Sequence, residues 1–532
     1  MFQLTDLPDT LYLEILTRLT PREIVLHRLV SRASHAALTR DDLSQALLHV
    51  FFPRSLECRI LRSHTSSGNA STTPDSEPPD WPAIFASVSR RYHNLSSGTL
   101  HSITTIPVLK DRKLLRPFAP WNRLLRRDGM SAPLQQHDAN WTYDDGVLVY
   151  PSPGTAPVLK ALDLCSGSEA SIPFDLSAKI IRRLRLSSGV LVVEWAEDGA
   201  FHPLNERDVA HRHFATAFNV HATSSPLLPN TGPAPEVSFR AEWKIHYLGL
   251  PLSSHDRLLS AHSAMHYAAY AHQPTRSPWG EDLPLERLVV WALGAPSNFQ
   301  PSLDPTSSRP VDDPGPEVIL RLANSDLDHW AIRQHDTPRI MKLALDEGHV
   351  FLQEEDHLWS SGPQSSSVPP ERHVVRSTGV PISGTGPRWV DECGAEGDAE
   401  RSFCPATFHD RDGDRNTKSW PGRAPCWRHE EFPYLTVAEV VDPAAGTRVC
   451  GRRCFAMETV SASTSLNVPD APDRAAVSDD DEDANADAWA GRGEVQFGND
   501  VWRTVMSGAA LAGDERWVVG EDAAGDVSVV RF

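Results

Sequence analysis

Apolar residues near the start of the chain recur every three or four positions, the spacing that places side chains on one face of an α-helix. The first helix can begin at Pro8, whose missing N–H costs nothing there, with Asp6 as its N-cap. Its apolar face consists of Leu11, Ile15, Leu16 and Leu19. A single short helix cannot bury such a face by itself, so the stripe predicts a partner, either the rest of the chain or another protein.

A second helix is predicted directly after the first. Thr20-Pro21-Arg22-Glu23 combines a capping box with proline at the first helical position. The apolar residues that follow are Ile24, Leu26, Leu29 and Val30. Two more short helices are expected at residues 31–38 and 43–51. The spacing alone fits an ordinary helical hairpin packed on the rest of the chain equally well.

From Trp141 onward the pattern changes to short apolar runs bounded by turn residues, which is typical of β-strands. The clearest unit runs from Phe239 to Leu293 and offers four consecutive strands, the size of one propeller blade. Without its low-complexity stretches this region keeps roughly 310 residues, enough for about seven blades of ~45 residues each. A large β-sandwich, or a pair of them, remains the alternative, because a single sequence does not show how strands close.

Composition divides the chain into three parts: helices at 1–52, a connecting region at 53–140 and a β domain at 141–532. Residues 63–80 and three stretches of the β domain are poor in apolar side chains, so we expect them to be disordered insertions. The three stretches are 298–316, 360–386 and 461–493. The predicted fold class is therefore α+β and multidomain, with a small all-α domain before a large all-β domain, a β-propeller of about seven blades.

The N-terminal pattern resembles the F-box motif in order and spacing, over Leu4 to Phe52. Leu7-Pro8-Asp9-Thr10-Leu11, Ile15-Leu16, Leu19, Ile24 and Leu29-Val30-Ser31-Arg32 carry the resemblance. It implies that these helices bind Skp1, the adaptor of a cullin–RING ubiquitin ligase. The residues implied in Skp1 binding are Leu7, Pro8, Leu11, Ile15, Leu16, Leu19, Ile24, Leu29 and Val30.

The function implied by this resemblance is that of a substrate receptor in an SCF-type ubiquitin ligase. Such a receptor makes no bonds itself but raises the effective concentration of a target protein near the ubiquitin-loaded enzyme. We expect the unidentified target to bind loops at one mouth of the propeller. A ligase-independent F-box scaffold and a propeller enzyme with a helical leader are the alternatives.

Charge and cysteine content narrow the expected partners. The net charge of −19 opposes contact with a phosphate backbone, so we expect no nucleic-acid partner. No apolar run approaches the ~18–20 residues of a membrane span, so no membrane partner is expected. Seven cysteines, an odd number, suit a reducing compartment, the cytoplasm and/or the nucleus. The basic residues at 112–116 and 123–127 are a local exception, although such clusters are more often a solvated face or a linker.

Motifs for catalysis are missing from the sequence. It contains no P-loop, no His-Glu-x-x-His and no Gly-x-Ser-x-Gly, so we expect a non-catalytic protein without a cofactor. The strand residues His211 and His213 do not complete a metal site, and a structural role is expected for them. The acidic run 479–483 lacks EF-hand spacing and predicts a solvated loop. A weak zinc candidate, which would need four converging ligands, is the set Cys426, His429, Cys450 and Cys454.

Overall fold

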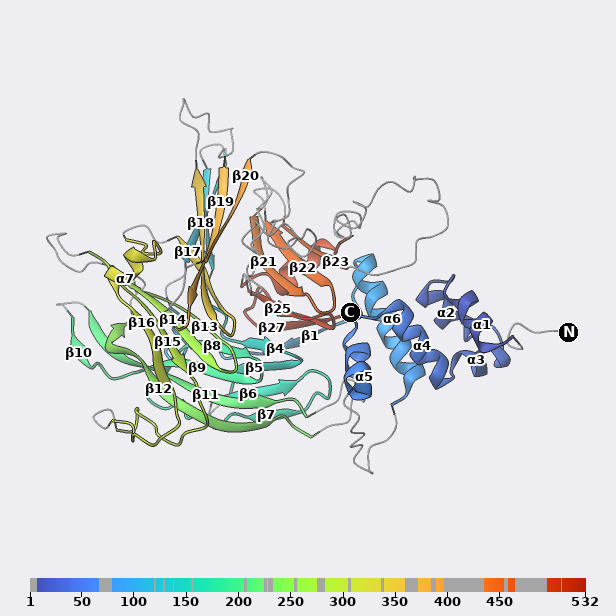
Figure 1. Cartoon of the computed structure of the whole chain (residues 1–532), viewed down its shortest axis with the longest axis horizontal. Helices are drawn as coiled ribbons and strands as arrows, with labels where there is room; N and C mark the ends of the chain where they lie inside the picture. The colour runs from blue at the N-terminus through green and yellow to red at the C-terminus, as the bar shows by residue number, and fades with distance from the viewer. Residues whose placement is uncertain are drawn as a thin grey trace.

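The protein consists of a group of helices at one end and a larger β domain beside it, as Figure 1 shows. This computed structural model describes residues 7–532 with interruptions. The interruptions are 67–78, 119–120, 128–129, 137, 155–156, 205–207, 224–226, 228–232, 253–255, 275–282, 305–307, 336–338, 359–371, 384–388, 397–434, 454–457, 465–494 and 509. The acidic run 479–483 and most of the expected insertions at 63–80 and 461–493 lie outside the described residues.

Six helices precede the β domain, and the first four confirm the helices expected from the spacing. They are α1 (Asp9–Leu16), α2 (Pro21–His27), α3 (Arg32–Leu38), α4 (Asp41–Phe51), α5 (Leu56–Ser66) and α6 (Trp81–Ser97). The predicted capping box of α2 is present, because Thr20 and Glu23 each bond the other's backbone N–H. The longest of these helices, α6, begins at an Asp80 cap and ends at Gly98, whose φ of +66° favours glycine.

The β domain contains six four-stranded antiparallel blades within the described residues. Blade 1 is β4 (Thr142–Asp144), β5 (Val147–Ser152), β6 (Val158–Asp163) and β7 (Glu169–Ser171). Blade 2 is β8 (Lys179–Ser187), β9 (Val190–Glu197), β11 (Val209–His221) and β12 (Glu236–Pro251), with the short β10 (His202–Pro203) beside β11. Blade 3 is β13 (Arg257–His262), β14 (His266–Gln273), β15 (Leu285–Ala292) and β16 (Glu317–Leu322).

The remaining three blades complete the ring. Blade 4 is β17 (Ile340–Leu345), β18 (His349–Leu358), β19 (Arg372–Pro381) and β20 (Trp389–Glu396). Blade 5 is β21 (Leu435–Asp442), β22 (Thr447–Arg453), β23 (Glu458–Thr464) and β24 (Val495–Gln496). Blade 6 is β25 (Leu511–Gly513), β26 (Trp517–Glu521), β27 (Val527–Arg531) and β1 (Ser102–Ile106). A separate hairpin, β2 (Trp121–Arg127) with β3 (Met130–Gln136), and the short helices α7 (Asn324–His329) and α8 (Asn499–Val505) connect blades.

The first strands of the blades surround a common axis, which identifies the β domain as a propeller rather than a sandwich. Strand β4 contacts β8, β8 contacts β13, β13 contacts β17, and β25 contacts both β21 and β4. The blade number is six, so the expected seven was wrong. Blades are longer than the assumed ~45 residues, since β11 and β12 alone span 13 and 16 residues.

Two sequence expectations about individual strands also need correction. The stretch from Phe239 to Leu293 is not one blade, because β12 completes blade 2 and blade 3 begins at β13. Strand β19 lies inside the stretch 360–386, which was expected to be an insertion. In each case the local composition shows strands or breaks but not the set of strands that hydrogen-bond into one sheet.

The ring closes by pairing the two ends of the β domain. Strand β1 lies antiparallel to β27, with Ser102 opposite Arg531 and Ile106 opposite Val527. Strand β27 is thereby enclosed between β26 and β1, and Val527 and Val530 are buried in it. This arrangement pairs backbone groups that would otherwise form two open edges. Residues 102–106, in the expected connecting region, are thus part of the propeller.

The alternating strand directions give the propeller two distinct faces. In each blade, the first strand connects to the second, and the third to the fourth, on the same face of the propeller. We call it the helix face, because α6 contacts β23 and β24 there. The other connections lie on the opposite face, called the far face, together with α7 and the hairpin β2–β3. Figure 1 shows the blue helices at one side of the ring and α7 at the other.

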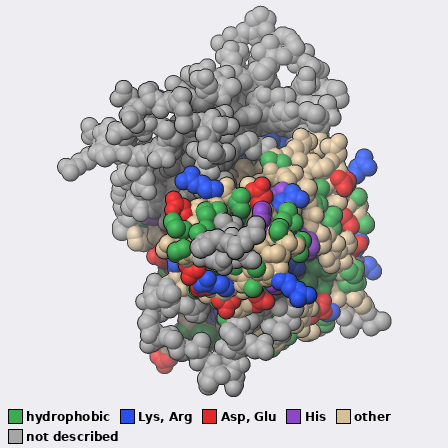
Figure 2. All heavy atoms as spheres, turned by 90° about the vertical axis from the view of Figure 1, so that its right-hand side faces the viewer, with side chains coloured by type: hydrophobic (Ala, Val, Ile, Leu, Met, Phe, Trp, Pro, Cys, Tyr) green, Lys and Arg blue, Asp and Glu red, His purple; other side chains and the backbone are tan. Residues whose placement is uncertain are grey.

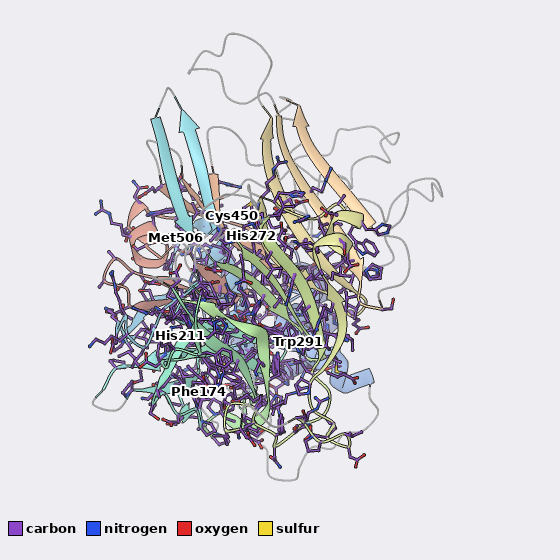
Figure 3. The ribbon with its side chains drawn as sticks, turned by 90° about the vertical axis from the view of Figure 1, so that its left-hand side faces the viewer. Phe174, His211, His272, Trp291, Cys450 and Met506 are labelled. Atoms are coloured by element: carbon purple, nitrogen blue, oxygen red, sulfur yellow. The ribbon has the colours of Figure 1, made fainter. Side chains whose placement is uncertain are left out.

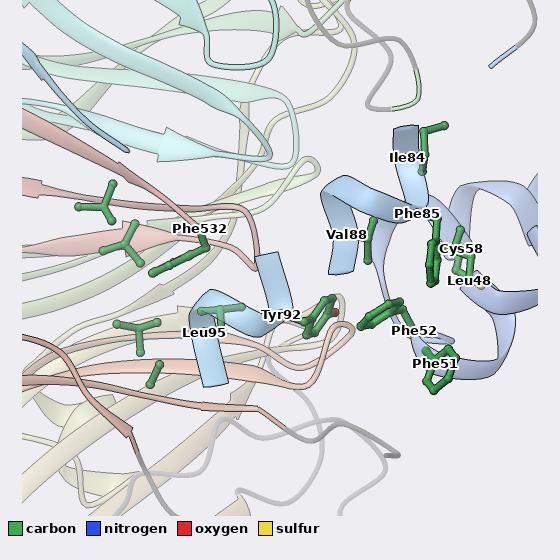
Figure 4. Packing of buried hydrophobic residues seen from close by; sticks show 14 of the residues in the cluster. Leu48, Phe51, Phe52, Cys58, Ile84, Phe85, Val88, Tyr92, Leu95 and Phe532 are labelled. Atoms are coloured by element: carbon green, nitrogen blue, oxygen red, sulfur yellow. The ribbon is translucent and has the colours of Figure 1, made fainter. Parts of the chain in front are cut away.

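A continuous hydrophobic core joins the helices to blades 5 and 6 (Figure 4). Phe52 of the first helical group stacks on Tyr92 of α6, with ring centroids 5.1 Å apart. On the other side of α6 the same core contains Phe532, which stacks on Phe497 at 5.7 Å. The fully buried Phe85 of α6 also belongs to this core. Helix α6 therefore contributes side chains to a core that the helices and the propeller share.

Buried charges tie the same parts together. Arg91 of α6 donates to both carboxylate oxygens of Glu57 on α5, at 2.6 and 3.2 Å, and lies 3.6 Å from Glu515 between β25 and β26. Glu515 also accepts hydrogen bonds from Tyr92 Oη at 2.5 Å and from the backbone N–H of Leu56 at 2.6 Å. Burial raises the pKa of Glu515, whereas for Glu57 the guanidinium of Arg91 outweighs burial and lowers the pKa.

We predict that truncation after Gly525 destroys the ring closure. The truncated chain lacks β27 and the buried side chains Val527, Val529, Val530 and Phe532, each worth roughly 1.5–3 kcal/mol when fully buried. Size-exclusion chromatography should show aggregation, and limited proteolysis should cleave the β domain. A chain ending at Arg531 keeps β27 and serves as the control. A truncated protein that stays monomeric and protease-resistant contradicts closure by this strand.

We also predict that Arg91→Ala destabilises the protein strongly, because it leaves Glu57 buried without its ion-pair partner and leaves Glu515 with only Arg59, 3.5 Å away, as a paired cation among the described residues. Breaking a buried pair in this way costs about 3–5 kcal/mol. Denaturant unfolding measures the loss, and Arg90→Ala, at an exposed position on the same helix, should stay within about 0.5 kcal/mol of the wild type. Equal effects of the two substitutions would show that the buried charges do not join the helices to the propeller.

Candidate functional site: an apolar surface on the N-terminal helices

The first two helices expose a group of large apolar side chains, which we call the apolar surface. Leu11 and Ile15 lie one turn apart on α1, Leu26 lies near the end of α2, and Leu29 and Val30 lie in the turn that follows. Leu29 and Val30 are the most exposed of the five, at 81% and 71%. Figure 2, which looks onto the helical end of the molecule, shows hydrophobic side chains at the surface among charged ones. Apolar side chains gathered at a surface are typical of protein contact sites, so these five residues are the candidate contact site of the helices.

The backbone between α2 and α3 explains why Leu29 and Val30 point to solvent. The N–H groups of Leu29 and Val30 bond the carbonyls of Leu26 and His27, at 3.0 and 3.2 Å, so the chain makes a tight turn. Ser31 then caps α3, its side chain accepting from the N–H of Ser34 at 3.0 Å. In this turn the two side chains are left largely uncovered by the described residues.

The nine residues implied in Skp1 binding differ in their exposure to solvent. Leu11, Ile15, Leu29, Val30 and Pro8 are exposed. Leu16 and Ile24 are buried in the core that includes α4 and α6, and the half-buried Leu7 and Leu19 pack against that core. Helical periodicity finds both apolar stripes of a helix but does not tell which one faces inward. The spacing placed Leu26 on the second helix, but the set of residues implied in Skp1 binding did not include it, although it lies three and four residues from Leu29 and Val30.

An exposed ion pair holds α1 against the start of α4. Arg40 donates to both carboxylate oxygens of Asp9, at 2.6 and 3.0 Å, and also to Asp42. Its guanidinium holds the pKa of Asp9 and of Asp42 below the ordinary range, first through these hydrogen bonds. The pairing connects the start of α1, the helix that carries Leu11 and Ile15, to the start of α4, and an exposed pair of this kind contributes at most about 1 kcal/mol.

The weak zinc candidate is not assembled in the described part of the chain. Cys450, labelled in Figure 3, is fully buried in β22, and the next residue, Gly451, lies against Met506. Cys426, His429 and Cys454 lie outside the described residues. No group of three or more His, Cys, Asp or Glu side chains that could hold a metal ion occurs among the residues that the structure describes.

The strand histidines bond backbone carbonyls. His211 Nδ1 lies 2.9 Å from Glu197 O, and His213 Nδ1 lies 2.8 Å from His211 O. Burial holds the pKa of His213 well below the ordinary value, so this side chain is neutral at physiological pH. Both side chains contribute to the packing of blade 2.

None of the helices in the described ranges has both the length and the apolar character needed to cross a membrane.

Comparisons with known proteins match the helical end of the chain to a known domain family. The F-box domain family matches residues 4–45, the segment that carries the apolar surface. No curated protein matches the chain. Similar solved structures include one titled "Crystal Structure of Mitotic Checkpoint Complex", at 8% identity over 82% of this chain and 95% of that chain, with a TM-score of 0.30.

A second similar structure is the C-terminal domain of gp131 from bacteriophage phiKZ, at 9% identity over 83% of this chain and 94% of that chain, with a TM-score of 0.20. Neither TM-score is high enough to support an argument about this protein. The assignment therefore depends on the family match and on the blades described above. The chain therefore carries an F-box domain at residues 4–45, followed by a six-bladed β-propeller region.

Proposed function

We propose that this protein is the substrate-receptor subunit of an SCF-type ubiquitin ligase. In this proposal the apolar surface binds a Skp1-type adaptor, through it a cullin–RING ligase, and the propeller binds a target protein. F-box domains bind Skp1 in cullin–RING ligases, and the F-box places the chain in the SCF adaptor family in general. The roles of the individual residues and of the propeller are the proposal.

The exposure of Leu29 and Val30 is the observation that carries the adaptor contact. These large apolar side chains are 81% and 71% exposed, in the turn between α2 and α3. Burying both against a partner would contribute on the order of 3 kcal/mol, which is more than a hundredfold in affinity. Leu11, Ile15 and Leu26 extend the same apolar surface, so the F-box offers a partner several large side chains at once.

The connection through α6 supports a receptor role for the propeller. Because α6 packs on the F-box helices and on blade 5, a target held by the propeller would be kept at a fixed distance from the adaptor. A fixed distance raises the effective concentration of target lysines near the ubiquitin-loaded enzyme. F-box proteins are generally non-catalytic adaptors, and we propose the same for this chain, without a cofactor and with the cytoplasm and/or nucleus as its place of action.

We predict that Leu29→Glu with Val30→Glu removes adaptor binding and leaves the protein folded. Two charges placed in an apolar contact would have to be desolvated without partners, which opposes binding. Both positions are exposed, so the melting temperature should change little. Quantitative pulldown of Skp1 measures binding, and circular dichroism measures folding.

The matched control carries the same substitutions at exposed apolar positions elsewhere, Val50→Glu on α4 and Met265→Glu in the turn after β13. It should retain Skp1 fully. Unchanged Skp1 binding by the Leu29/Val30 variant would refute the proposed contact. Copurification decides between the functions: cullin together with Skp1 supports a ligase receptor, Skp1 without cullin supports a ligase-independent scaffold, and neither partner supports a propeller enzyme.

A further inference from the structure

The interface between blades 2 and 3 contains a buried arginine. Arg182 is the extra residue of a β-bulge in β8, where the pairing with β9 shifts between Ile181 and Arg183. It is 2% exposed, and its guanidinium lies over the ring of Phe118, 4.4 Å from the ring centroid. Phe118 belongs to the hydrophobic core that blades 2 and 3 share. The arginine is therefore enclosed by protein on the side where the two blades meet.

The charge of Arg182 has no ion-pair partner among the described residues. Its Nε and Nη1 atoms also lack a hydrogen-bond partner in that part of the chain. Burial, followed by the guanidinium groups of Arg183 and Arg116, lowers the pKa of Arg182 to about 9, so the side chain remains positively charged at neutral pH. A charge held out of water without an anion strongly opposes folding. An anion taken up from solution would remove this cost.

The adjacent arginine shows how the fold neutralises a buried cation. Arg183 donates to Glu194 at 3.1 Å and pairs with Asp138, so two carboxylates balance its charge. Asp256 and Glu194 attract Arg182 electrostatically, but neither of them forms an ion pair with it. The chain therefore provides paired carboxylates for only one of these two neighbouring arginines.

A buried histidine beside the same aromatic ring supplies a hydrogen-bond acceptor. His213 of β11 is fully buried, and its ring centroid lies 5.9 Å from that of Phe118. Because His213 Nδ1 lies 2.8 Å from the carbonyl oxygen of His211, which can only accept, we assign the ring proton to Nδ1. Burial holds the pKa of His213 well below its ordinary value, so the ring is neutral and Nε2 is an acceptor. This Nε2 has no hydrogen-bond partner among the described residues.

The unused groups of Arg182 and His213 define the chemistry of a ligand. The arginine offers two donors and a positive charge, and the histidine offers one acceptor. His246, opposite His213 in β12, adds no charge, because burial lowers its pKa to about 4. Water can donate and accept but leaves the charge unbalanced, and chloride or sulfate cannot donate. An oxyanion with an O–H group meets all three requirements.

We propose that the interface between blades 2 and 3 binds a small oxyanion that carries an O–H group, such as bicarbonate or hydrogen phosphate. Its oxygens accept from Arg182 Nε and Nη1, and its hydroxyl donates to His213 Nε2. The bound anion connects β8 to β11 across β9 and stabilises the propeller. This inference goes beyond the receptor role and does not depend on it, because the site lies inside the propeller and apart from the apolar surface.

Anion-dependent melting of the full-length protein tests the proposal. The protein is dialysed into a buffer whose only anion is bulky and organic, and is then titrated with sodium phosphate, bicarbonate, sulfate or chloride at constant ionic strength. We expect a saturable rise in melting temperature of about 3 °C or more with phosphate or bicarbonate, because a ligand that binds only the folded state stabilises it. Sulfate and chloride should give only the gradual change of general salt effects. A saturable rise with one of the two supports the proposal and identifies the ligand.

The variant Arg182→Met keeps an unbranched side chain and removes the charge. It should lose the saturable rise and, in the anion-free buffer, melt no lower than the wild type, since a buried unpaired cation is removed. Arg321→Met, at an exposed position of β16, is the matched control and should keep the rise. If Arg182→Met does not fold, His213→Phe decides the matter: it removes the acceptor and should abolish the preference for phosphate or bicarbonate over sulfate.

Ion chromatography of the denatured protein gives a second measurement. After equilibration with phosphate or bicarbonate and removal of free salt, the wild type should release about one anion per chain, as expected for a single site. Release without a further rise in melting temperature supports the proposal, because the site is then already filled.

Equal rises with all four salts, an equal saturable rise in the wild type and Arg182→Met, or no saturable rise together with no released anion overturns the proposal. An unchanged anion preference in His213→Phe does the same. Skp1 pulldown reports on a different surface, so a failure of the anion site leaves the proposed function intact, and a failure to retain Skp1 leaves the anion site intact.

Discussion

The arrangement of the whole molecule depends on one guanidinium group, that of Arg91. It lies between Glu57 on α5 and Glu515 on the helix face of blade 6. All three residues are buried, and they are far apart in the sequence. Two carboxylates so close together, out of water, would repel each other without a cation between them. The same helix places Tyr92 against both Phe52 and Glu515, so apolar contact and charge neutralisation coincide on α6. Together, the apolar contacts and the buried ion pairs of α6 hold the F-box at a defined angle to the propeller.

The position of α6 in the chain makes this connection direct. The helix ends at Ser97, and β1, the strand that closes the ring, begins at Ser102. The F-box, the helix that fixes it and the closing strand therefore form one continuous N-terminal segment. A change in the packing of α6 acts on both the F-box and the closing blade, which is why the core around Phe85 and Phe532 is shared rather than divided between two domains.

Local signals in the sequence predicted the elements well and their assembly less well. The capping box at Thr20 and Glu23 and the stripe at Leu11, Ile15 and Leu16 located α1 and α2, because capping and periodicity act over a few residues. Strand composition identified the propeller class but not the blade limits, since no residue near Phe239 shows that β12 belongs with β11. The contact among Glu57, Arg91 and Glu515 gives no local signal, because partners more than 400 residues apart carry no sequence spacing to read. For the same reason the inward direction of Leu16 and Ile24 became visible only with the fold.

The pairing of β1 with β27 has a consequence for synthesis on the ribosome. Strand β1 emerges before its partner β27, which follows about 400 residues later; at 5–20 residues per second this delay is roughly 20–80 s. The edge of β1 has no partner until β27 emerges, and the propeller-facing side of α6 has none until β23 and β24 emerge, so both are surfaces that chaperones can recognise. Only a chain translated through β27 can close the ring, and a product that terminates before β27 would carry the F-box helices without the complete propeller on which α6 packs.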